Sequence, residues 1–275
     1  MADDLGNEWW LDAKDSEDTA KDEETKKKKR KREEPSAHIL NSDISDKAPD
    51  VNDTNKVKTK KKQKKPKIES ITTTLDGSKV TDVLWSTFCN CTSGSLSALE
   101  LEDIMIDESC CLTDDTVHTG ALEEFSAYLT QVIPKWSGRV TKLNKKGHRG
   151  CPLLLVVSSA ATRIVELNRA SVKFKGDCKT VKLFAKHIKI SEQEHFLESY
   201  VVHFGLGTPS RILKLLQNGS LKTSRLKYVI LDWTWRDKKL RSMIDIPEVQ
   251  KELVILLKDY IFPLAKASKL KIGLF

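Results

Sequence analysis

Residues 207–235 read GTPSRILKLLQNGSLKTSRLKYVILDWTW, a stretch that predicts a helix followed by a buried strand. Thr208 suits the N-cap position and Pro209 the first helical position, where the missing N–H of proline costs nothing. Gly219 marks the end of this helix, because glycine readily adopts the left-handed conformation that follows a last turn. The continuous apolar run from Leu226 to Leu231 then predicts a strand that is covered on both faces.

The same alternation of strand and helix signals continues through the C-terminal half of the chain. Apolar runs predict strands at 153–157, 181–184, 200–204 and 269–275, and helical stripes predict helices near 122–132, 160–170, 191–198 and from 248 onward. Strands that alternate with helices are typical of a parallel sheet with helices on both faces. We therefore expect a single α/β domain over residues 119–275.

Charge is distributed unevenly along the chain. Residues 1–70 carry 18 basic and 17 acidic groups with hardly any apolar run, so we expect a disordered tail that cannot bury a core. Residues 71–118 are expected to form an acidic, partly ordered segment. Residues 127–275 carry 28 basic and 11 acidic groups. A domain this basic favours a polyanionic partner such as RNA, because its cations displace counterions from phosphates.

The tail contains two kinds of motif. The lysine-rich clusters at 26–32 and 58–67 are typical of a nuclear or nucleolar address that binds import receptors or RNA, although a merely solvating tail is an alternative. Trp9 and Trp10 are adjacent indoles in an acidic setting without a core. We interpret them as a docking motif for a partner protein, with a chance pair of aromatics as the alternative.

Other chemistry is not indicated by the sequence. Cys89 and Cys91, like Cys110 and Cys111, lack the two-residue gap of common zinc ribbons, so no metal site is expected. No apolar stretch reaches the length of a membrane span, so we expect no membrane partner. Three histidines do not form a metal or catalytic motif and are expected at the surface or in helix caps: His187, His195 and His203.

The motifs of the quoted stretch resemble those of the first RecA-like domain of DEAD-box RNA helicases. Residues 207–211 resemble the G-T-P-G-R motif of that family, and Thr162 with Arg163 is similar to the Thr-Arg pair of its P-T-R-E-L motif. The resemblance implies a single RecA-like sheet whose strand ends contact RNA phosphates. The candidate phosphate-binding residues are Thr162, Arg163, Gly207, Thr208, Pro209 and Arg211. A helix N-terminus at Thr208 would offer free N–H groups, with an ordinary cap as the alternative.

The nucleotide-binding residues of such helicases are largely missing. No G-x-x-x-x-G-K-[ST] loop occurs, and the resemblance implies only a remnant at Thr119 and Gly120, where Glu123 and Glu124 would repel a triphosphate. Asp232 is retained, but Trp233 replaces the acid that would orient the attacking water, and an indole can only donate a hydrogen bond. We therefore predict no enzymatic activity and no nucleotide cofactor. Trp233 and Trp235 either pack in the fold or dock a partner.

The combination of a lysine-rich tail, an acidic Trp-Trp motif and one degenerate helicase-like domain resembles the CMS ribosomal small subunit homolog family. That resemblance implies a nucleolar protein of early small-subunit pre-ribosomes. We predict a non-catalytic factor that binds pre-rRNA or a small nucleolar ribonucleoprotein and contacts pre-ribosomal proteins through Trp9 and Trp10. Basic loops at Arg139–Arg149 and Arg236–Arg241 would extend the RNA footprint. The alternatives are a protein-interaction scaffold and a divergent ATPase or helicase.

Overall fold

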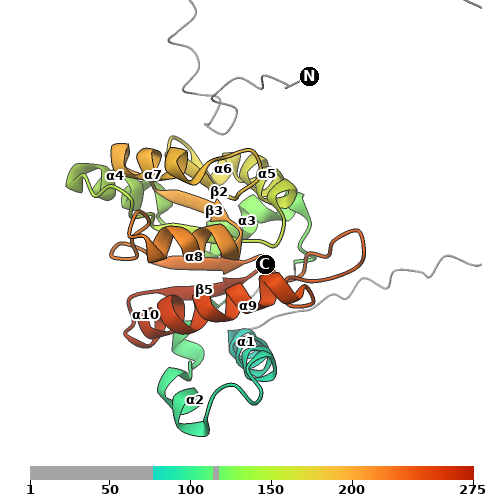
Figure 1. Cartoon of the computed structure of the whole chain (residues 1–275). Coiled ribbons are helices and arrows are strands. Elements are labelled where there is room, and N and C mark those ends of the chain that lie inside the picture. Colours follow the sequence, from blue (N-terminus) through green and yellow to red (C-terminus); the bar gives the residue numbers. More distant parts are fainter. Residues whose placement is uncertain (1–76, 114–117) are drawn as a thin grey trace, which may run out of the picture. The chain divides into compact units, whose positions relative to one another are not determined.

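Five parallel strands form one sheet in the order β2-β3-β1-β4-β5 (Figure 1). The computed structural model describes residues 77–113 and 118–275, which all lie in one compact unit of the chain. The strands are β1 (Leu154–Val157), β2 (Thr180–Leu183), β3 (Phe204–Gly207), β4 (Tyr228–Leu231) and β5 (Lys271–Leu274). Their first residues are in register across the sheet, so all five strands begin at one edge and end at the other.

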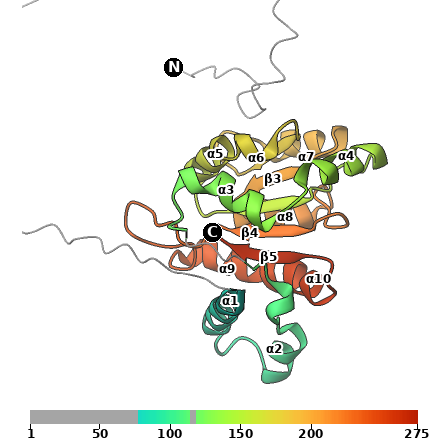
Figure 2. The same cartoon turned by 180° about the vertical axis from the view of Figure 1, so that it is seen from behind.

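Helices cover both faces of the sheet (Figures 1 and 2). One face packs against α1 (Gly77–Cys91), α2 (Ala98–Ile104), α7 (Ile190–Ser199), α8 (Pro209–Gln217), α9 (Pro247–Leu256), the π-helical segment η3 (Leu257–Ile261) and α10 (Phe262–Lys266). The other face packs against α3 (Leu122–Val132), α4 (Trp136–Lys146), α5 (Ala161–Ala170) and α6 (Val172–Lys175). A short 3-10 helix, η2 (Glu108–Cys110), lies next to β5, the edge strand of the sheet. The predicted parallel α/β sheet with helices on both faces is confirmed.

The strands are apolar throughout because each has two buried faces. In β1, Leu154 and Val156 belong to the core beneath α3 and α5, whereas Leu155 and Val157 belong to the core beneath α8 and α9. All four are at most 1% exposed. Period-two alternation between two cores explains why the sequence shows a continuous apolar run instead of an alternating one.

The predicted strand at 200–204 was misplaced, since β3 spans Phe204–Gly207. The glycines of β3 are part of the strand because neighbouring side chains leave no room beside them. A Cβ on Gly205 would lie 3.1 Å from Leu155, and a Cβ on Gly207 would lie 2.5 Å from the carbonyl oxygen of Leu183. A glycine at such a close approach belongs to the packing of the sheet.

The described part of the acidic segment is built into the same core as the sheet. Val80, Leu84 and Phe88 lie on one side of α1 and are at most 2% exposed. The ring of Phe88 lies 4.9 Å from that of Phe262 in α10. At the end of this segment, a parallel bridge joins Cys111 to Ile272 of β5. The division of the chain at residue 119 stays a prediction.

The predicted basic loop at Arg139–Arg149 is wrong for most of its length, because α4 continues to Lys146. Trp136 and Leu143 are buried on the inner side of this helix. Gly147 then adopts a left-handed conformation, with φ of 63°, and ends it. The basic side chains of this segment are therefore carried by a helix and the turn that follows it.

Candidate functional site

The candidate nucleotide site lies where β1 and β4 end, at the carboxyl edge of the sheet. Ser158 directly follows β1, Asp232 directly follows β4, and Arg163 lies in the first turn of α5. Because β1 and β4 are parallel neighbours, Asp232 is brought to Arg163 and Ser158, which lie 69 and 74 residues earlier in the sequence. In open parallel sheets this edge is the usual place for a ligand.

Arg163 and Asp232 form a buried ion pair with two parallel hydrogen bonds. The Nε and Nη2 atoms of Arg163 donate to Oδ2 and Oδ1 of Asp232, each at 3.1 Å. The Ser158 hydroxyl donates to Oδ2 of Asp232 at 2.7 Å. Both oxygens of the carboxylate that could have held a magnesium-bound water are therefore occupied by side chains of the same chain.

Burial and pairing act on Asp232 in opposite directions. Removal from water raises the pKa of the Asp232 carboxyl, while the Arg163 guanidinium and the Ser158 hydroxyl oppose that shift. The side chain of Asp232 is fully buried and that of Arg163 is 5% exposed. A charge in such a place is stabilised only while its partner is present. The pair therefore holds α5 against the end of β4.

Gly120 and the loop between β4 and α9 also contact the Arg163–Asp232 pair. Nη2 of Arg163 donates to the carbonyl oxygen of Gly120 at 2.8 Å, and the guanidinium carbon lies 6.0 Å from the centre of the Trp235 ring. Gly120 has a φ of +76°, and a Cβ there would lie 1.8 Å from Oγ1 of Thr234. The backbone around Gly120 is thus packed against the β4–α9 loop, where a phosphate-binding loop would need open space.

Glu124 interacts with its own helix terminus. Its Oε2 accepts hydrogen bonds from the N–H of Thr119 at 2.7 Å and from the Thr119 hydroxyl at 3.0 Å. The backbone hydrogen bond from Thr119 lowers the pKa of the Glu124 carboxyl. Glu123 is exposed and forms no such contact. Glu124 in the first turn of α3 therefore binds the backbone of Thr119, which lies just before the helix.

Trp233 lies apart from this cluster. It packs, half-buried, against the core beneath α1 and α9 and lines a small pocket with Phe88 and Ile244. The backbone N–H of Trp233 donates to the carbonyl oxygen of Phe275 at 2.6 Å. Of the two interpretations of this residue, packing describes its position in the fold.

Thr208 and Arg211 lie at the start of α8, beside the loop that follows β2. Thr208 occupies the N-cap position and Pro209 the first turn, as predicted, but the Thr208 side chain forms no cap hydrogen bond. Arg211 donates to the carbonyl oxygen of Ile188 at 3.2 Å and to Oε1 of Gln193 at 2.7 Å. Gln193 is fully buried and donates in turn to two carbonyl oxygens of the β2 segment. In this structure Arg211 therefore binds the loop after β2 and the start of α7.

Thr162 is exposed and lies in a hollow of about 330 Å³ on the same edge. The hollow is also lined by Glu166 and Arg169 from α5 and by Phe184, Lys186 and His187 from the loop after β2. Of the six candidate phosphate-binding residues, Thr162 has the most accessible side chain, whereas Arg163 and Pro209 are buried. Gly207 lies in the sheet itself.

His203 departs from the surface position that was predicted for it. It is 3% exposed, its Nδ1 accepts from the N–H of Lys179 at 3.0 Å, and its Nε2 lies 2.8 Å from Oδ1 of Asn144. Since Nδ1 accepts, Nε2 carries the proton and donates to Asn144. Burial lowers the pKa of His203. The residue joins α4 to the segment before β3.

Several predictions fall outside these contacts. Trp9, Trp10 and the lysine-rich clusters at 26–32 and 58–67 lie outside the described residues. Within residues 77–113 and 118–275, no group of three or more His, Cys, Asp or Glu side chains could hold a metal ion. In the same part of the chain, no helix has both the length and the apolar composition needed to cross a membrane.

A model of one protein family, described as CMS1, a U3-containing 90S pre-ribosomal complex subunit, matches residues 12–269. The chain belongs to this family. Protein CMSS1 of Xenopus laevis is 37% identical over 290 residues, which cover the whole of both chains. Human Protein CMSS1 is 44% identical over 179 residues, which cover 64% of this chain and 61% of the human one. Protein CMS1 of Chaetomium thermophilum is 32% identical over 165 residues and is covered to 64% of its length.

Membership of the CMS1 family confirms the family predicted from the tail and the degenerate domain. The fold and the Arg163–Asp232 contacts alone do not identify this family, because similar sheets occur in proteins of many functions. Ser158 and Gln193 were missed by sequence reasoning. Nothing in their neighbourhood marks them, since each acts through a partner that is distant in the sequence.

Proposed function

We propose that this CMS1-family chain is a non-catalytic factor that binds RNA or ribonucleoprotein during assembly of the small ribosomal subunit. The buried pair of Arg163 and Asp232 carries the proposal. It occupies the carboxylate that a helicase-like site would need for magnesium, and Gly120 and Trp235 enclose it. In the described residues of this region, the Gly120 segment is packed against Thr234 instead of forming an open phosphate-binding loop, and the exposed carboxylate of Glu123 would repel a triphosphate.

RNA binding is supported by charge and by accessible groups at the strand ends. Residues 127–275 carry 28 basic and 11 acidic groups. On the carboxyl edge, the hollow around Thr162 is lined by exposed Arg169 and Lys186, which could pair with phosphates. The family description, which refers to a U3-containing 90S pre-ribosomal complex, supports an RNA-rich setting. A nuclear and nucleolar location, with import through 26–32 and 58–67, belongs to the same proposal.

Thermal unfolding of the full chain tests both halves of the proposal. We expect no change in Tm on addition of ATP with Mg²⁺, and a rise in Tm with a single-stranded oligouridylate. A ligand at 100 times its Kd would stabilise the fold by about 2.7 kcal/mol, which such a measurement detects. A saturable rise in Tm with ATP would support the divergent ATPase instead. No rise with RNA, and no RNA crosslink within residues 77–275, would remove RNA binding by the fold.

A protein-interaction scaffold is the second candidate, and one observation favours it. Leu99 in α2 is 71% exposed, and Met105 directly after α2 is 53% exposed. A partner protein that covers this short helix and the residue after it would bury both apolar side chains. Trp233 and Trp235 are less suited to that role because they are half-buried in contacts of the fold. Exchange of Leu99 and Met105 to Ser should release pre-ribosomal proteins without affecting RNA crosslinks if the scaffold holds.

A further inference from the structure

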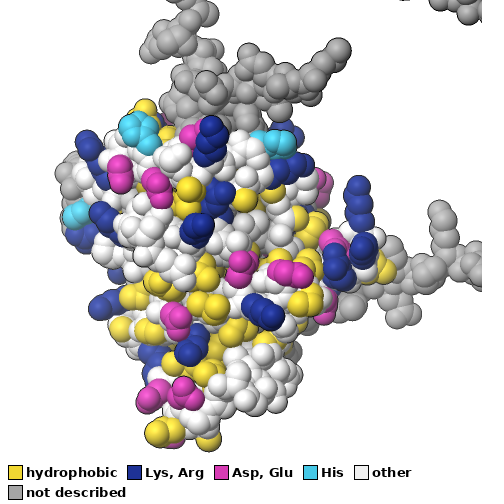
Figure 3. Space-filling view, viewed as in Figure 1, with side chains coloured by type: hydrophobic (Ala, Val, Ile, Leu, Met, Phe, Trp, Pro, Cys, Tyr) yellow, Lys and Arg dark blue, Asp and Glu magenta, His cyan; other side chains and the backbone are white. Residues whose placement is uncertain are grey.

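The edge at which the strands begin carries a concentration of basic side chains. We define the amino-edge basic surface as Arg139, Lys142, Arg149, Lys222, Arg225 and Lys227. These residues lie in α4, in the turn before β1 and in the segment before β4. Since β1 and β4 are adjacent and parallel, their preceding segments meet at one edge of the sheet. In Figure 1 the strands begin on the left, and Figure 3 shows Lys and Arg side chains along that margin.

Direct contacts hold these segments side by side. The N–H of Lys222 donates to the carbonyl oxygen of Gly150 at 2.7 Å, and the N–H of Lys227 donates to that of Leu153 at 2.9 Å. Nη2 of Arg225 lies 2.6 Å from Nε2 of His148. The guanidinium of Arg139 lies 5.4 Å from the centre of the Tyr228 ring, the first residue of β4. The backbone positions of these cations are therefore fixed relative to one another.

The cations of this surface are not neutralised by carboxylates in the described part of the chain. Lys142, Arg149, Lys222 and Lys227 are exposed, and the side-chain partners of Arg149, Arg225 and Lys227 are carbonyl oxygens or a histidine nitrogen. On the carboxyl edge, exposed Arg169 and Lys186 accompany arginines that are already paired: Arg163 with Asp232, and Arg241 with Asp237 at 2.8 Å. Unpaired cations on a fixed surface attract a polyanion over the distance of a Debye length.

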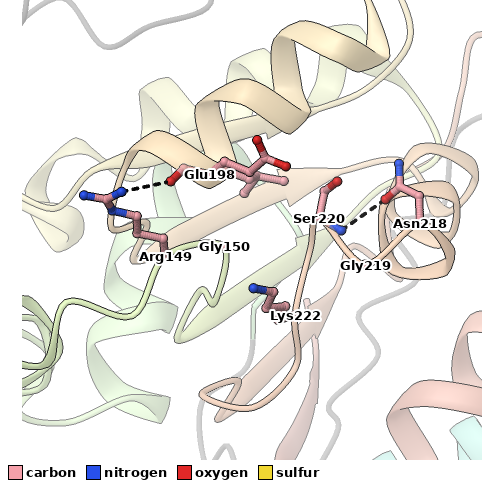
Figure 4. A pocket seen from close by; sticks show the side chains of 8 residues that line it. Arg149, Gly150, Glu198, Asn218, Gly219, Ser220 and Lys222 are labelled. Atoms are coloured by element: carbon pink, nitrogen blue, oxygen red, sulfur yellow. Dashed lines mark hydrogen bonds between the residues drawn. The ribbon is translucent and has the colours of Figure 1, made fainter.

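A hollow of about 310 Å³ opens within this surface (Figure 4). Arg149, Gly150 and Lys222 line one part of it, and Asn218, Ser220 and Glu198 line the rest. Gly150 has a φ of +67°, and a Cβ there would lie 2.6 Å from the carbonyl oxygen of Ser220, so only glycine lets these two segments approach so closely. In Figure 4 the Glu198 carboxylate and the Lys222 ammonium come from different elements and do not point toward each other.

We infer that the amino-edge basic surface is an RNA-binding surface, on which the phosphate backbone of a single strand crosses the segments before β1 and β4 and passes the hollow between Arg149 and Lys222. This inference rests on the proposed function, because it assumes that RNA is the polyanion. It adds a location: the edge opposite the strand ends that the helicase resemblance implies. A groove of cations that tracks a backbone is a common way to bind single strands.

Two charge-reversal variants of the full chain compare the two edges. The first is Arg149→Glu, Lys222→Glu and Lys227→Glu; the second, matched in number and exposure, is Lys186→Glu, Lys238→Glu and Lys239→Glu. Both keep the tail, so its contribution to binding is the same in each. Affinity for a labelled oligouridylate is measured against salt, and 4-thiouridine crosslinks are mapped on the unaltered chain. Tm checks folding, and the corresponding Gln triples replace any Glu triple that fails to fold.

We expect crosslinks within 139–149 and 222–227. We also expect the first variant to bind about tenfold more weakly, with a salt slope lower by about 2. The second variant, which removes Lys186 from the hollow around Thr162, should lose clearly less affinity than the first. Crosslinks near Thr162 and Lys186 alone, with weakening only in the second variant, would overturn this inference and leave the proposed function intact. No crosslink in the described residues would remove RNA binding by the fold. Equal affinity for poly-glutamate would assign the surface to an acidic protein and overturn the inference.

Discussion

The sequence predicts Arg163 as a ligand for RNA phosphate, but the structure gives it a partner within the chain. Its two hydrogen bonds to Asp232 and its bond to the Gly120 carbonyl use three of the directions in which a guanidinium can donate. A motif that resembles a phosphate-binding one thus has a second use: it fixes a loop, a strand end and a helix to one another. From sequence alone, the Thr162–Arg163 pair looks the same whether the arginine binds a phosphate or an aspartate of the same chain.

Removal of one partner from this pair should be severely destabilising. Asp232→Asn leaves the buried Arg163 charge without a counter-charge, and we expect a loss of about 3–5 kcal/mol in the free energy of unfolding. Arg163→Met should cost a similar amount. The double variant should be more stable than either single one, since neither charge is then left alone. Urea unfolding of the four proteins measures this coupling, and single variants that each cost under about 1 kcal/mol would contradict the buried pair.

Gly120 offers a test of close packing at the same site. Gly120→Ala places a Cβ 1.8 Å from Oγ1 of Thr234 and keeps a φ of +76°, whereas Gly94→Ala has the matching φ of +77° with no atom within 4 Å. Both variants carry the strain of a left-handed alanine, of order 1 kcal/mol. We expect Gly120→Ala to cost about 1–3 kcal/mol more than Gly94→Ala in urea unfolding. Equal costs would show that the Gly120 segment is not packed against the β4–α9 loop.

His203 should make the fold sensitive to acid. Burial holds its folded-state pKa below the ordinary value of 6.5, so the unfolded chain takes up a proton first as the pH falls. The stability that the neutral ring provides is present above pH 6.5 and is lost as the pH falls through the folded-state pKa. His203→Gln should flatten the dependence of unfolding free energy on pH below 6.5 relative to the unaltered chain. The same slope in the variant and in the unaltered chain would contradict the assignment.

At the residue scale, a single sequence indicates which side chains have reactive or charged groups, but not which other side chains they contact. Asp232, Thr119 and Gly120 were all predicted as site residues from the resemblance to DEAD-box helicases. That Arg163 binds Asp232, or that Arg211 binds Gln193, depends on which strands are neighbours, and a single sequence does not contain that order. The burial of His203 was missed for the same reason, because Asn144 and Lys179 reach it from other elements.

At the scale of elements, Glu124 in the first turn of α3 binds the segment that precedes the helix. Oε2 of Glu124 accepts the Thr119 N–H, so Glu124→Gln should weaken that bond and cost about 0.5–1 kcal/mol. Glu123→Gln removes the same charge from the same turn without losing a hydrogen bond, and should cost less. Urea unfolding of the two variants measures the difference. Equal values would mean that the hydrogen bond to Thr119 adds no stability beyond the effect of the charge.

The helices that were missed had readable signals that composition obscured. In α4, Trp136, Val140 and Leu143 recur at helical spacing, but the basic residues between them favoured a loop. In α1, Val80, Leu84 and Phe88 recur every four residues. The acidic charge of residues 71–118 favoured a partly ordered segment instead of this helix. Net charge describes the outer side of a helix and says little about its buried side. Strand β3 was displaced because its glycines suggested a turn.

For the whole molecule, the two edges of the sheet differ in how their charges are used. At the carboxyl edge, the arginines of the candidate site are engaged by Asp232, Gln193 and carbonyl oxygens. At the amino edge, Lys142, Lys222 and Arg149 face solvent without a carboxylate partner in the described residues. Because all five strands start in register, the segments that carry these exposed cations meet along one edge of the sheet, where the proposed RNA-binding surface lies.

The acidic segment should unfold together with the sheet, because it shares one core with it. Phe88 in α1 is 2% exposed and packs edge-on against Phe262, so Phe88→Ala should cost about 3–5 kcal/mol in a single unfolding transition. Leu99→Ala in α2 removes an exposed side chain and should cost little. Hydrogen exchange of β5 amides should accelerate in the first variant alone, since β5 lies beside this core. Loss of protection confined to 77–91 would mean that α1 is an independent attachment.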